Sequence, residues 1–222
     1  MRAQMRGESR VILLGVIVLG SIAGLVSLAS IQGGESASTE GGSVQGKILL
    51  EIPGTTLATV GPIVVFLEPE DSSLKPAVPE KPVIMEQKDV KFVPDFAIVC
   101  IGQPLEMPNL DKISHNAFSF SKPNTFDLGV YPKGETRKVT FQHSGLVDLF
   151  CSIHSKMNAT VYVAPTPYHA RVSPAGAFEI RDIPSGKYTL KTWNRKLPEA
   201  KQSIEISQGK GADVAVKIAA GK

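Results

Sequence analysis

Cysteine is scarce in this sequence, which has only Cys100 and Cys151 among its 222 residues. Two cysteines are too few for a disulfide-stapled scaffold, and they suffice for one bridge or one thiolate site. Common catalytic motifs are also missing: the sequence contains no Gly-x-Ser-x-Gly, no His-Glu-x-x-His and no phosphate-binding loop. We therefore expect a protein that is not an enzyme.

The sequence has no large excess of charge of either sign. The formal net charge is +3, and much of the excess comes from three arginines in the first ten residues. Nothing in this balance indicates a nucleic-acid partner. Twenty glycines and 16 prolines lie between short runs of Val, Ile and Phe. This pattern favours many short strands joined by turns, so the expected fold class is all-β.

The N-terminus has the pattern of a segment that directs a protein to or across a membrane. Residues 11–29 form an uncharged apolar segment, which we expect to be helical, and they follow Arg2, Arg6 and Arg10. Residues 1–29 are either a signal peptide or, since the apolar run is long enough to span a bilayer, an uncleaved membrane anchor. In both cases we expect a periplasmic or extracytoplasmic protein, with residues 30–43 as a flexible linker.

Strand patterns recur along the rest of the chain. A connector rich in proline, serine and charge covers residues 70–81, and a break falls near residue 82. Within residues 157–163, alternate side chains starting at Met157 are apolar and share one face. The expected strands are residues 44–51, 62–68, 96–100, 137–141, 146–151, 157–163, 169–172, 177–180, 188–193, 203–206 and 213–218.

Three soft metal ligands lie within seven residues at the end of one expected strand and the start of the next: Cys151, His154 and Met157. A trigonal copper site needs a second imidazole from elsewhere in the chain. His115 is the candidate, because it lies where a polar loop leads into a strand. Two histidines, one cysteine and a weak axial methionine match the ligand set of blue-copper electron-transfer sites.

Residues 83–163 resemble a small cupredoxin of the plastocyanin, amicyanin and pseudoazurin group, which has a Greek-key β-sandwich fold. Three motifs carry the resemblance: Ser-His-Asn-Ala-Phe-Ser-Phe at residues 114–120, Gly-Glu-Thr-Arg-Lys-Val-Thr-Phe at 134–141, and Phe-Cys-Ser-Ile-His-Ser-Lys-Met at 150–157. The resemblance implies one mononuclear type 1 copper site with the ligands His115, Cys151, His154 and Met157. It also implies that Asn116 does not bind the metal but ties the two ligand loops together by hydrogen bonds.

The same resemblance implies a function. A cupredoxin passes single electrons between redox partners, here a cytochrome or a dehydrogenase, through the solvent-near histidine of the ligand loop, His154. The chain is also similar to proteins of methylamine utilisation. Two alternatives stay open: copper storage, delivery or sensing with the same ligands, and a metal-free structural module with a Cys100–Cys151 disulfide. Without that disulfide, Cys100 is expected to be a small buried apolar residue, since it lies in an apolar strand.

Residues 176–193 resemble a second family, the transthyretin-like, carboxypeptidase-regulatory-like β-sandwich. The signals are Gly-x-Phe and Pro-x-Gly-x-Tyr-x-Leu, and residues 44–69 resemble the first strands of that fold. We therefore expect a cupredoxin domain at residues 82–164, inserted into a second small β-sandwich made of residues 44–81 and 165–222. In the alternative, tandem arrangement, residues 44–81 supply early strands to the cupredoxin, and residues 165–222 fold separately.

Overall fold

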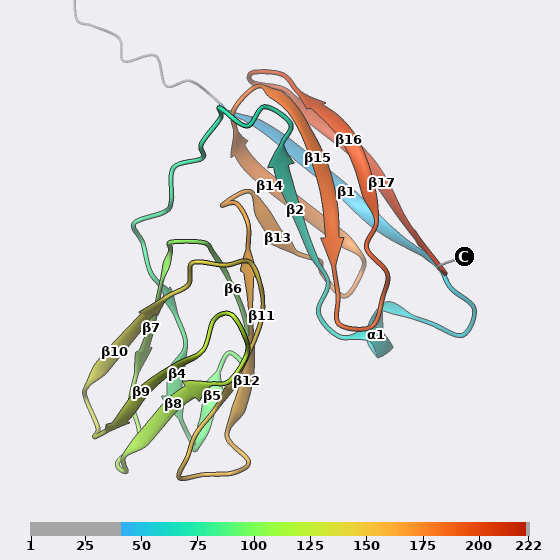
Figure 1. Ribbon diagram of the computed structural model, residues 1–222. Coiled ribbons are helices and arrows are strands. Elements are labelled where there is room, and N and C mark those ends of the chain that lie inside the picture. The colour runs from blue at the N-terminus through green and yellow to red at the C-terminus, as the bar shows by residue number, and fades with distance from the viewer. Residues whose placement is uncertain (1–40, 221–222) are drawn as a thin grey trace, which may run out of the picture. The chain divides into compact units, whose positions relative to one another are not determined.

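The computed structural model describes residues 41–220, whose regular secondary structure is almost entirely β-strand (Figure 1). The predicted all-β class is confirmed. The only helix of this range is the short α1 (Leu57–Val60), and no helix here is long and apolar enough to cross a membrane. The expected signal peptide or anchor at residues 1–29, its apolar helix and all but the end of the linker lie outside the described residues.

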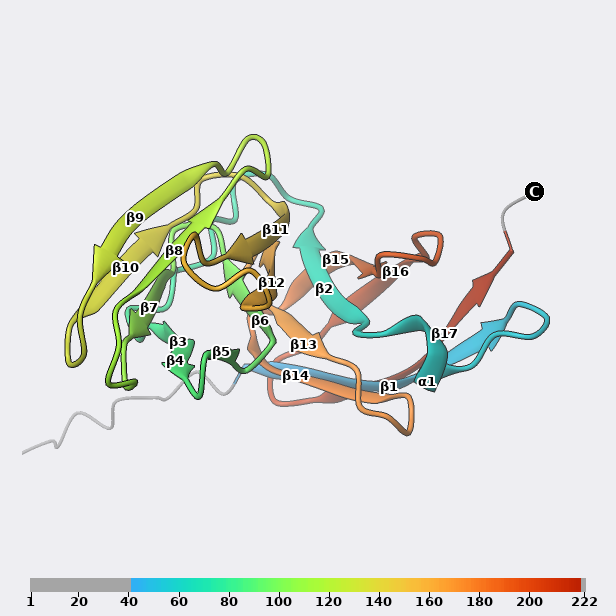
Figure 2. The ribbon, with the colours of Figure 1, turned by 90° about the horizontal axis from the view of Figure 1, so that it is seen from below.

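Two sheets form what we call the terminal sandwich, because its strands come from both ends of the described chain (Figure 2). In one sheet, β1 pairs antiparallel with β14 and parallel with β17. In the other sheet, β2 pairs antiparallel with β13 and β15. The strands are β1 (Gly42–Glu51), β2 (Val64–Pro69), β13 (His169–Arg171), β14 (Ala177–Ile183), β15 (Gly186–Trp193), β16 (Lys201–Ile206) and β17 (Gly211–Ala219).

The alternating pattern of the sequence accounts for the core of the terminal sandwich. Val44 and Ile48 of β1 point inward and are buried, and they meet Leu67 of β2 and Leu190 of β15 in one apolar cluster. Burial of this apolar surface is the main favourable term in folding. The middle strand of the three-stranded sheet, β1, and one of the two inner strands of the four-stranded sheet, β2, come from the N-terminal side of the chain.

The strands between β2 and β13 form the central sandwich. Its larger sheet has the order β6-β12-β11-β8-β9, and its smaller sheet has the order β10-β7-β3, beside the hairpin β4-β5. The strands are β3 (Val83–Ile84), β4 (Glu86–Lys88), β5 (Lys91–Val93), β6 (Phe96–Cys100), β7 (Pro104–Pro108), β8 (His115–Ser119), β9 (Phe126–Tyr131), β10 (Thr136–Thr140), β11 (Gly145–Phe150) and β12 (Asn158–Ala164).

Strand β12 is buried on both faces. The predicted face beginning at Met157 lies in the core of the central sandwich, together with Ala159 and Val161. On the opposite face, Tyr162 joins a separate apolar cluster that includes Phe66 of β2 in the terminal sandwich. The outer face of a sandwich sheet is usually polar and wet. Here part of that face is covered by residues of the terminal sandwich.

The two cysteines form no disulfide. The Cys100–Cys151 bridge expected in the structural-module alternative is therefore wrong. Cys100 is buried in β6, as expected for a small apolar residue, and burial raises the pKa of its thiol.

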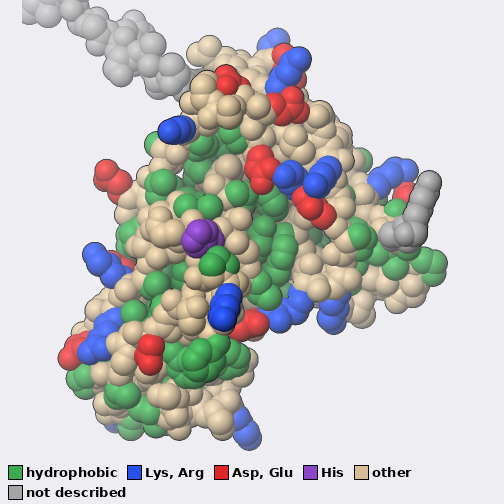
Figure 3. Space-filling view, in the orientation of Figure 1, with side chains coloured by type: hydrophobic (Ala, Val, Ile, Leu, Met, Phe, Trp, Pro, Cys, Tyr) green, Lys and Arg blue, Asp and Glu red, His purple; other side chains and the backbone are tan. Residues whose placement is uncertain are grey.

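Charged side chains of both signs are mixed over the face shown in Figure 3, with no patch of a single sign, as the small net charge of the sequence leads one to expect.

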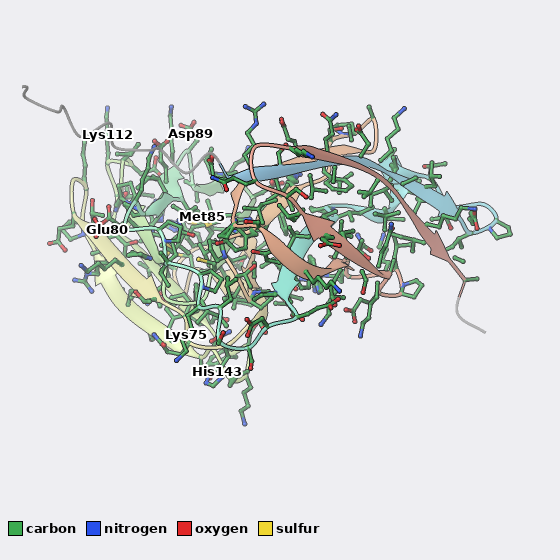
Figure 4. All side chains as sticks on the ribbon, turned by 90° about the horizontal axis from the view of Figure 1, so that it is seen from above. Lys75, Glu80, Met85, Asp89, Lys112 and His143 are labelled. Carbon is green, nitrogen blue, oxygen red and sulfur yellow. The ribbon has the colours of Figure 1, made fainter. Side chains whose placement is uncertain are left out.

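Within the central sandwich, Met85 is buried. In the view of Figure 4, Lys112 and Asp89 lie at one edge of this sandwich, and His143 lies at the opposite edge.

Candidate metal centre

Three of the predicted ligands come together at one end of the central sandwich. The donor atoms of His115, Cys151 and His154 all lie within 4.8 Å of one another. The two imidazole Nδ1 atoms are 3.1 Å apart, and Cys151 Sγ lies 3.8 Å from His154 Nδ1. His115 and Cys151 are buried, whereas His154 is partly exposed. The cluster therefore reaches the surface through one histidine.

Strand pairing brings the two ligand segments together. His115 is the first residue of β8, and Cys151 directly follows β11, which is the neighbouring strand in the sheet. The loop after β11 closes on itself, because Cys151 N–H donates to the Met157 carbonyl (3.2 Å) and Met157 N–H donates to the His154 carbonyl (2.9 Å). These bonds fold residues 151–157 into a compact turn.

A carboxylate that the sequence reasoning missed orients His115. Its Nε2 lies 2.7 Å from Asp111 Oδ2. An ionised carboxylate only accepts hydrogen bonds, so Nε2 carries the proton, and Nδ1 presents its lone pair to the cluster. Burial raises the pKa of Asp111, but hydrogen bonds from Val90, His115 and Asp89 outweigh burial and leave this pKa below its usual value. Asp111 is thus an ionised partner for the imidazole.

Asn116 contacts Cys151 through its backbone and β9 through its side chain. Its backbone N–H points at Cys151 Sγ over 3.5 Å, and its side-chain amide donates to Asp127 Oδ1 on β9 (2.9 Å). Its Oδ1 is buried and has no hydrogen-bond partner among the described residues. The contact between the two ligand segments is therefore made by the backbone of Asn116, and its side chain joins β8 to β9.

Met157 is 1% exposed and packs in the same apolar cluster as Cys151. Its backbone contacts Cys151 directly, as described above, which places the residue beside the cluster. The axial position of its thioether stays a prediction.

Two of the three separations between the donor atoms suit a single metal ion. Borderline metals bind imidazole nitrogen at about 2.0 Å and thiolate sulfur at about 2.3 Å, so two ligands of one ion lie roughly 3 to 4 Å apart. The observed separations of 3.1 and 3.8 Å fall in this range. Two imidazoles with one thiolate suit copper or zinc. His143 and His169 are not part of the cluster.

Fold and site together define an all-β protein with a His-Cys-His cluster that is buried except at His154. A family model described as polysaccharide lyase family 4, domain II, matches residues 152–214. It differs from the transthyretin-like family expected for part of this stretch, so that resemblance stays a prediction. No curated protein sequence matches the chain.

Several solved structures are similar to part of the chain. A copper-containing nitrite reductase from Thermus scotoductus SA-01 has 24% identity over 43% of this chain and 25% of its own, with a TM-score of 0.37. An amicyanin mutant in the oxidized state has 19% identity over 37% of this chain and 81% of its own (TM-score 0.35). A purple cupredoxin from Nitrosopumilus maritimus has 18% identity over 38% of this chain and 100% of its own (TM-score 0.33).

The chain thus spans a quarter of the length of the nitrite reductase. Methylamine utilisation is not named in these comparisons, and that resemblance stays a prediction as well.

Proposed function

We propose that this protein binds one copper ion through His115, Cys151, His154 and Met157 and carries single electrons between redox partners. One observation carries the proposal: the sulfur of Cys151 and an imidazole nitrogen of His154, from one loop, lie within 4.8 Å of each other and of an imidazole nitrogen of His115, from a distant part of the sequence. This ligand set is typical of blue-copper electron-transfer sites. Copper would supply the one-electron Cu(II)/Cu(I) couple.

The residues of the cluster have separate roles in this proposal. Cys151 supplies a buried thiolate, and Asp111 holds the His115 imidazole in the tautomer that offers Nδ1. His154 is partly exposed, so its ring edge is the point at which an electron enters and leaves. The two backbone hydrogen bonds of the loop would keep these groups in place when copper is bound.

The test of copper binding is spectroscopic. Metal-free protein titrated with Cu(II) should take up one equivalent and develop an intense thiolate-to-copper charge-transfer band in the visible range. Cys151→Ser should abolish the band, because it removes the thiolate, whereas Cys100→Ala is the matched control and should keep it. A colourless wild-type protein after copper addition would refute the proposal.

A second measurement separates electron transfer from storage or delivery of copper. An electron carrier should be reduced reversibly and should exchange electrons rapidly between its oxidised and reduced forms, as NMR line broadening in mixtures of the two would show. Slow exchange, together with ready transfer of copper to a chelator, would favour storage or delivery.

The proposal extends to the setting of the protein. We propose an extracytoplasmic carrier that is not itself an enzyme, works with a cytochrome or a dehydrogenase, and is held at the membrane if the apolar segment at residues 11–29 is kept. The sequence pattern of residues 1–29 supports this location. Protease added to intact spheroplasts should digest the protein, and protection until lysis would place it in the cytosol instead.

A further inference from the structure

The predicted ligand loop is held between two strands, because β11 leads into Cys151 and β12 follows Met157. On the outer faces of these strands, Asp148 and Thr160 lie directly opposite each other in the antiparallel register. The Thr160 hydroxyl donates a hydrogen bond to Asp148 Oδ1 (3.2 Å). Each of these two residues is three positions from an end of the loop, so a group that holds both also holds the ends of the loop.

Arg195 of the terminal sandwich is that group. Its Nη1 donates to Asp148 Oδ2 (3.3 Å), its Nη2 donates to Asp148 Oδ1, and Nη2 also lies 3.5 Å from Thr160 Oγ1. A planar guanidinium that binds both oxygens of a carboxylate restrains direction as well as distance. The side chain of Arg195 is 51% exposed and that of Asp148 is 34% exposed, so this contact orients the strands more than it stabilises the fold.

Trp193, two residues before Arg195, makes the apolar part of the same contact. Its ring stacks on Tyr162 of β12, with centroids 4.4 Å apart and planes 22° apart. It is also nearly parallel to the ring of Phe96 on β6, at 6.4 Å. Tyr162 is 4% exposed as a result. Aromatic stacking of this kind contributes beyond the area it buries.

We propose that Trp193 and Arg195 are positioning residues for the metal centre: they hold β11 and β12 from outside the central sandwich and thereby set the geometry of the loop at residues 151–157. The terminal sandwich is then part of the framework of the site, and a central sandwich without it has a looser loop. The copper measurements below rest on the proposed function, whereas the hydrogen-exchange measurement does not.

The first experiment uses the full, metal-free chain. Hydrogen exchange of the Cys151 and Met157 amides, which make the two bonds that close the loop, reports directly on loop opening. Arg195→Gln should speed their exchange about two- to fivefold, and Trp193→Ala should speed it roughly tenfold or more. Amides of the core strand β7 should keep their protection. Arg181→Gln is the matched control, because Arg181 makes a comparable exposed ion pair with Glu179 on β14 (2.8 Å) and should change nothing.

The second experiment uses the copper-loaded chain. Arg195→Gln should shift the reduction potential and the energy of the charge-transfer band, Arg195→Lys should restore them in part, and Arg181→Gln should leave both unchanged. If Trp193→Ala does not fold, Trp193→Phe replaces it with a smaller expected effect of the same sign.

The outcomes are distinguishable. Unchanged loop exchange and unchanged potential in folded Arg195 and Trp193 variants would overturn the positioning role while leaving copper binding intact. Faster loop exchange in a protein that takes up no copper would refute the proposed function and support the positioning of the loop.

Discussion

Asp111 accepts hydrogen bonds from the backbone N–H groups of Asp89 and Val90 as well as from His115. The backbone of Asp89 and Val90 therefore fixes the carboxylate, and the carboxylate in turn fixes the imidazole of His115. A carboxylate behind a ligating histidine restrains the ring and raises its basicity. At the scale of single residues, this contact is the main support of the cluster outside the proposed ligands.

Removing that support should weaken metal binding. We expect Asp111→Ala to lower the copper affinity by about 10- to 100-fold, because His115 then loses the bond that selects its tautomer. Competition with a chelator of known affinity measures the change. Asp213→Ala, which removes an exposed aspartate from β17, should leave the affinity as in the wild type. Equal affinities for the Asp111 variant and the wild type would show that the carboxylate does not support the site.

His169 makes the stability of the protein depend on pH. Burial lowers its pKa to about 4 from the usual 6.5, so the folded protein keeps this imidazole neutral. Between about pH 4 and pH 6.5 the unfolded chain binds a proton that the folded chain does not. The contribution of His169 is therefore complete above pH 6.5 and is lost as the pH falls towards 4, with an upper limit of about 3 kcal/mol.

The measurement is denaturant unfolding at pH 7 and pH 5. The loss of unfolding free energy between these two values should be smaller in His169→Gln than in the wild type. His143→Gln is the control for the loss of a histidine at an exposed position. If the loss in His169→Gln equals that of the wild type, the imidazole is not buried in its neutral form.

The sequence points to part of the site for a physical reason. Cys151, His154 and Met157 are predictable because their roles depend on local spacing within one loop. Asp111 is not, because an aspartate in a polar loop has no distinctive pattern, and two of its hydrogen-bond donors, Asp89 and Val90, lie more than twenty positions away. Contacts of this kind depend on tertiary structure.

At the scale of elements, the alternation of apolar and other side chains is the pattern that predicts strands. It predicts β12 well, because apolar side chains recur at every second position from Met157. Strands β7 and β9 were not expected: β7 begins and ends with proline, and Gly129 with its positive φ interrupts β9. The outer face of β12 was also missed, since Tyr162 in a strand gives no sign of what covers it.

Strand β1 contains a position that accepts only glycine. A Cβ at Gly46 would lie 2.3 Å from the Val214 carbonyl oxygen and 2.8 Å from the ring of Phe178. We expect Gly46→Ala to lower the free energy of unfolding by about 1–3 kcal/mol, because strands on both sides must move. Chemical denaturation measures it. Gly211→Ala, whose nearest contact is the Ser43 hydroxyl at 3.3 Å, should be nearly neutral, and similar losses in the two variants would contradict the argument.

At the scale of the whole molecule, we propose that the central sandwich is an insertion in the terminal one. The strand orders β14-β1-β17 and β13-β2-β15-β16 support this, since both sheets need strands from before and after the insertion. Leu67 N–H already donates to the Tyr168 carbonyl (2.9 Å), so the chain leaves and re-enters the terminal sandwich at neighbouring points.

Two truncated chains test the insertion. Residues 165–222 alone should stay unfolded, because they lack the strand that β14 and β17 share. A chain in which an Asn-Gly turn replaces residues 71–166 should fold cooperatively and bind no copper, since β2 and β13 then form a hairpin. Circular dichroism and NMR dispersion distinguish the two states. A folded 165–222 fragment would favour the tandem arrangement.

The pairing of β1 with β17 also has a consequence for timing. Residues Ser43 to Glu51 pair with Gly211 to Ala219. The first strand of the described chain therefore completes its pairing only when the last strand is present. Domains generally fold in order from the N-terminus as a chain is made. We therefore expect the central sandwich, which ends at Ala164, to fold while β1 still lacks both of its neighbours, β14 and β17. In this order, the loop at residues 151–157 is made before Trp193 and Arg195, the two residues that we propose restrain it.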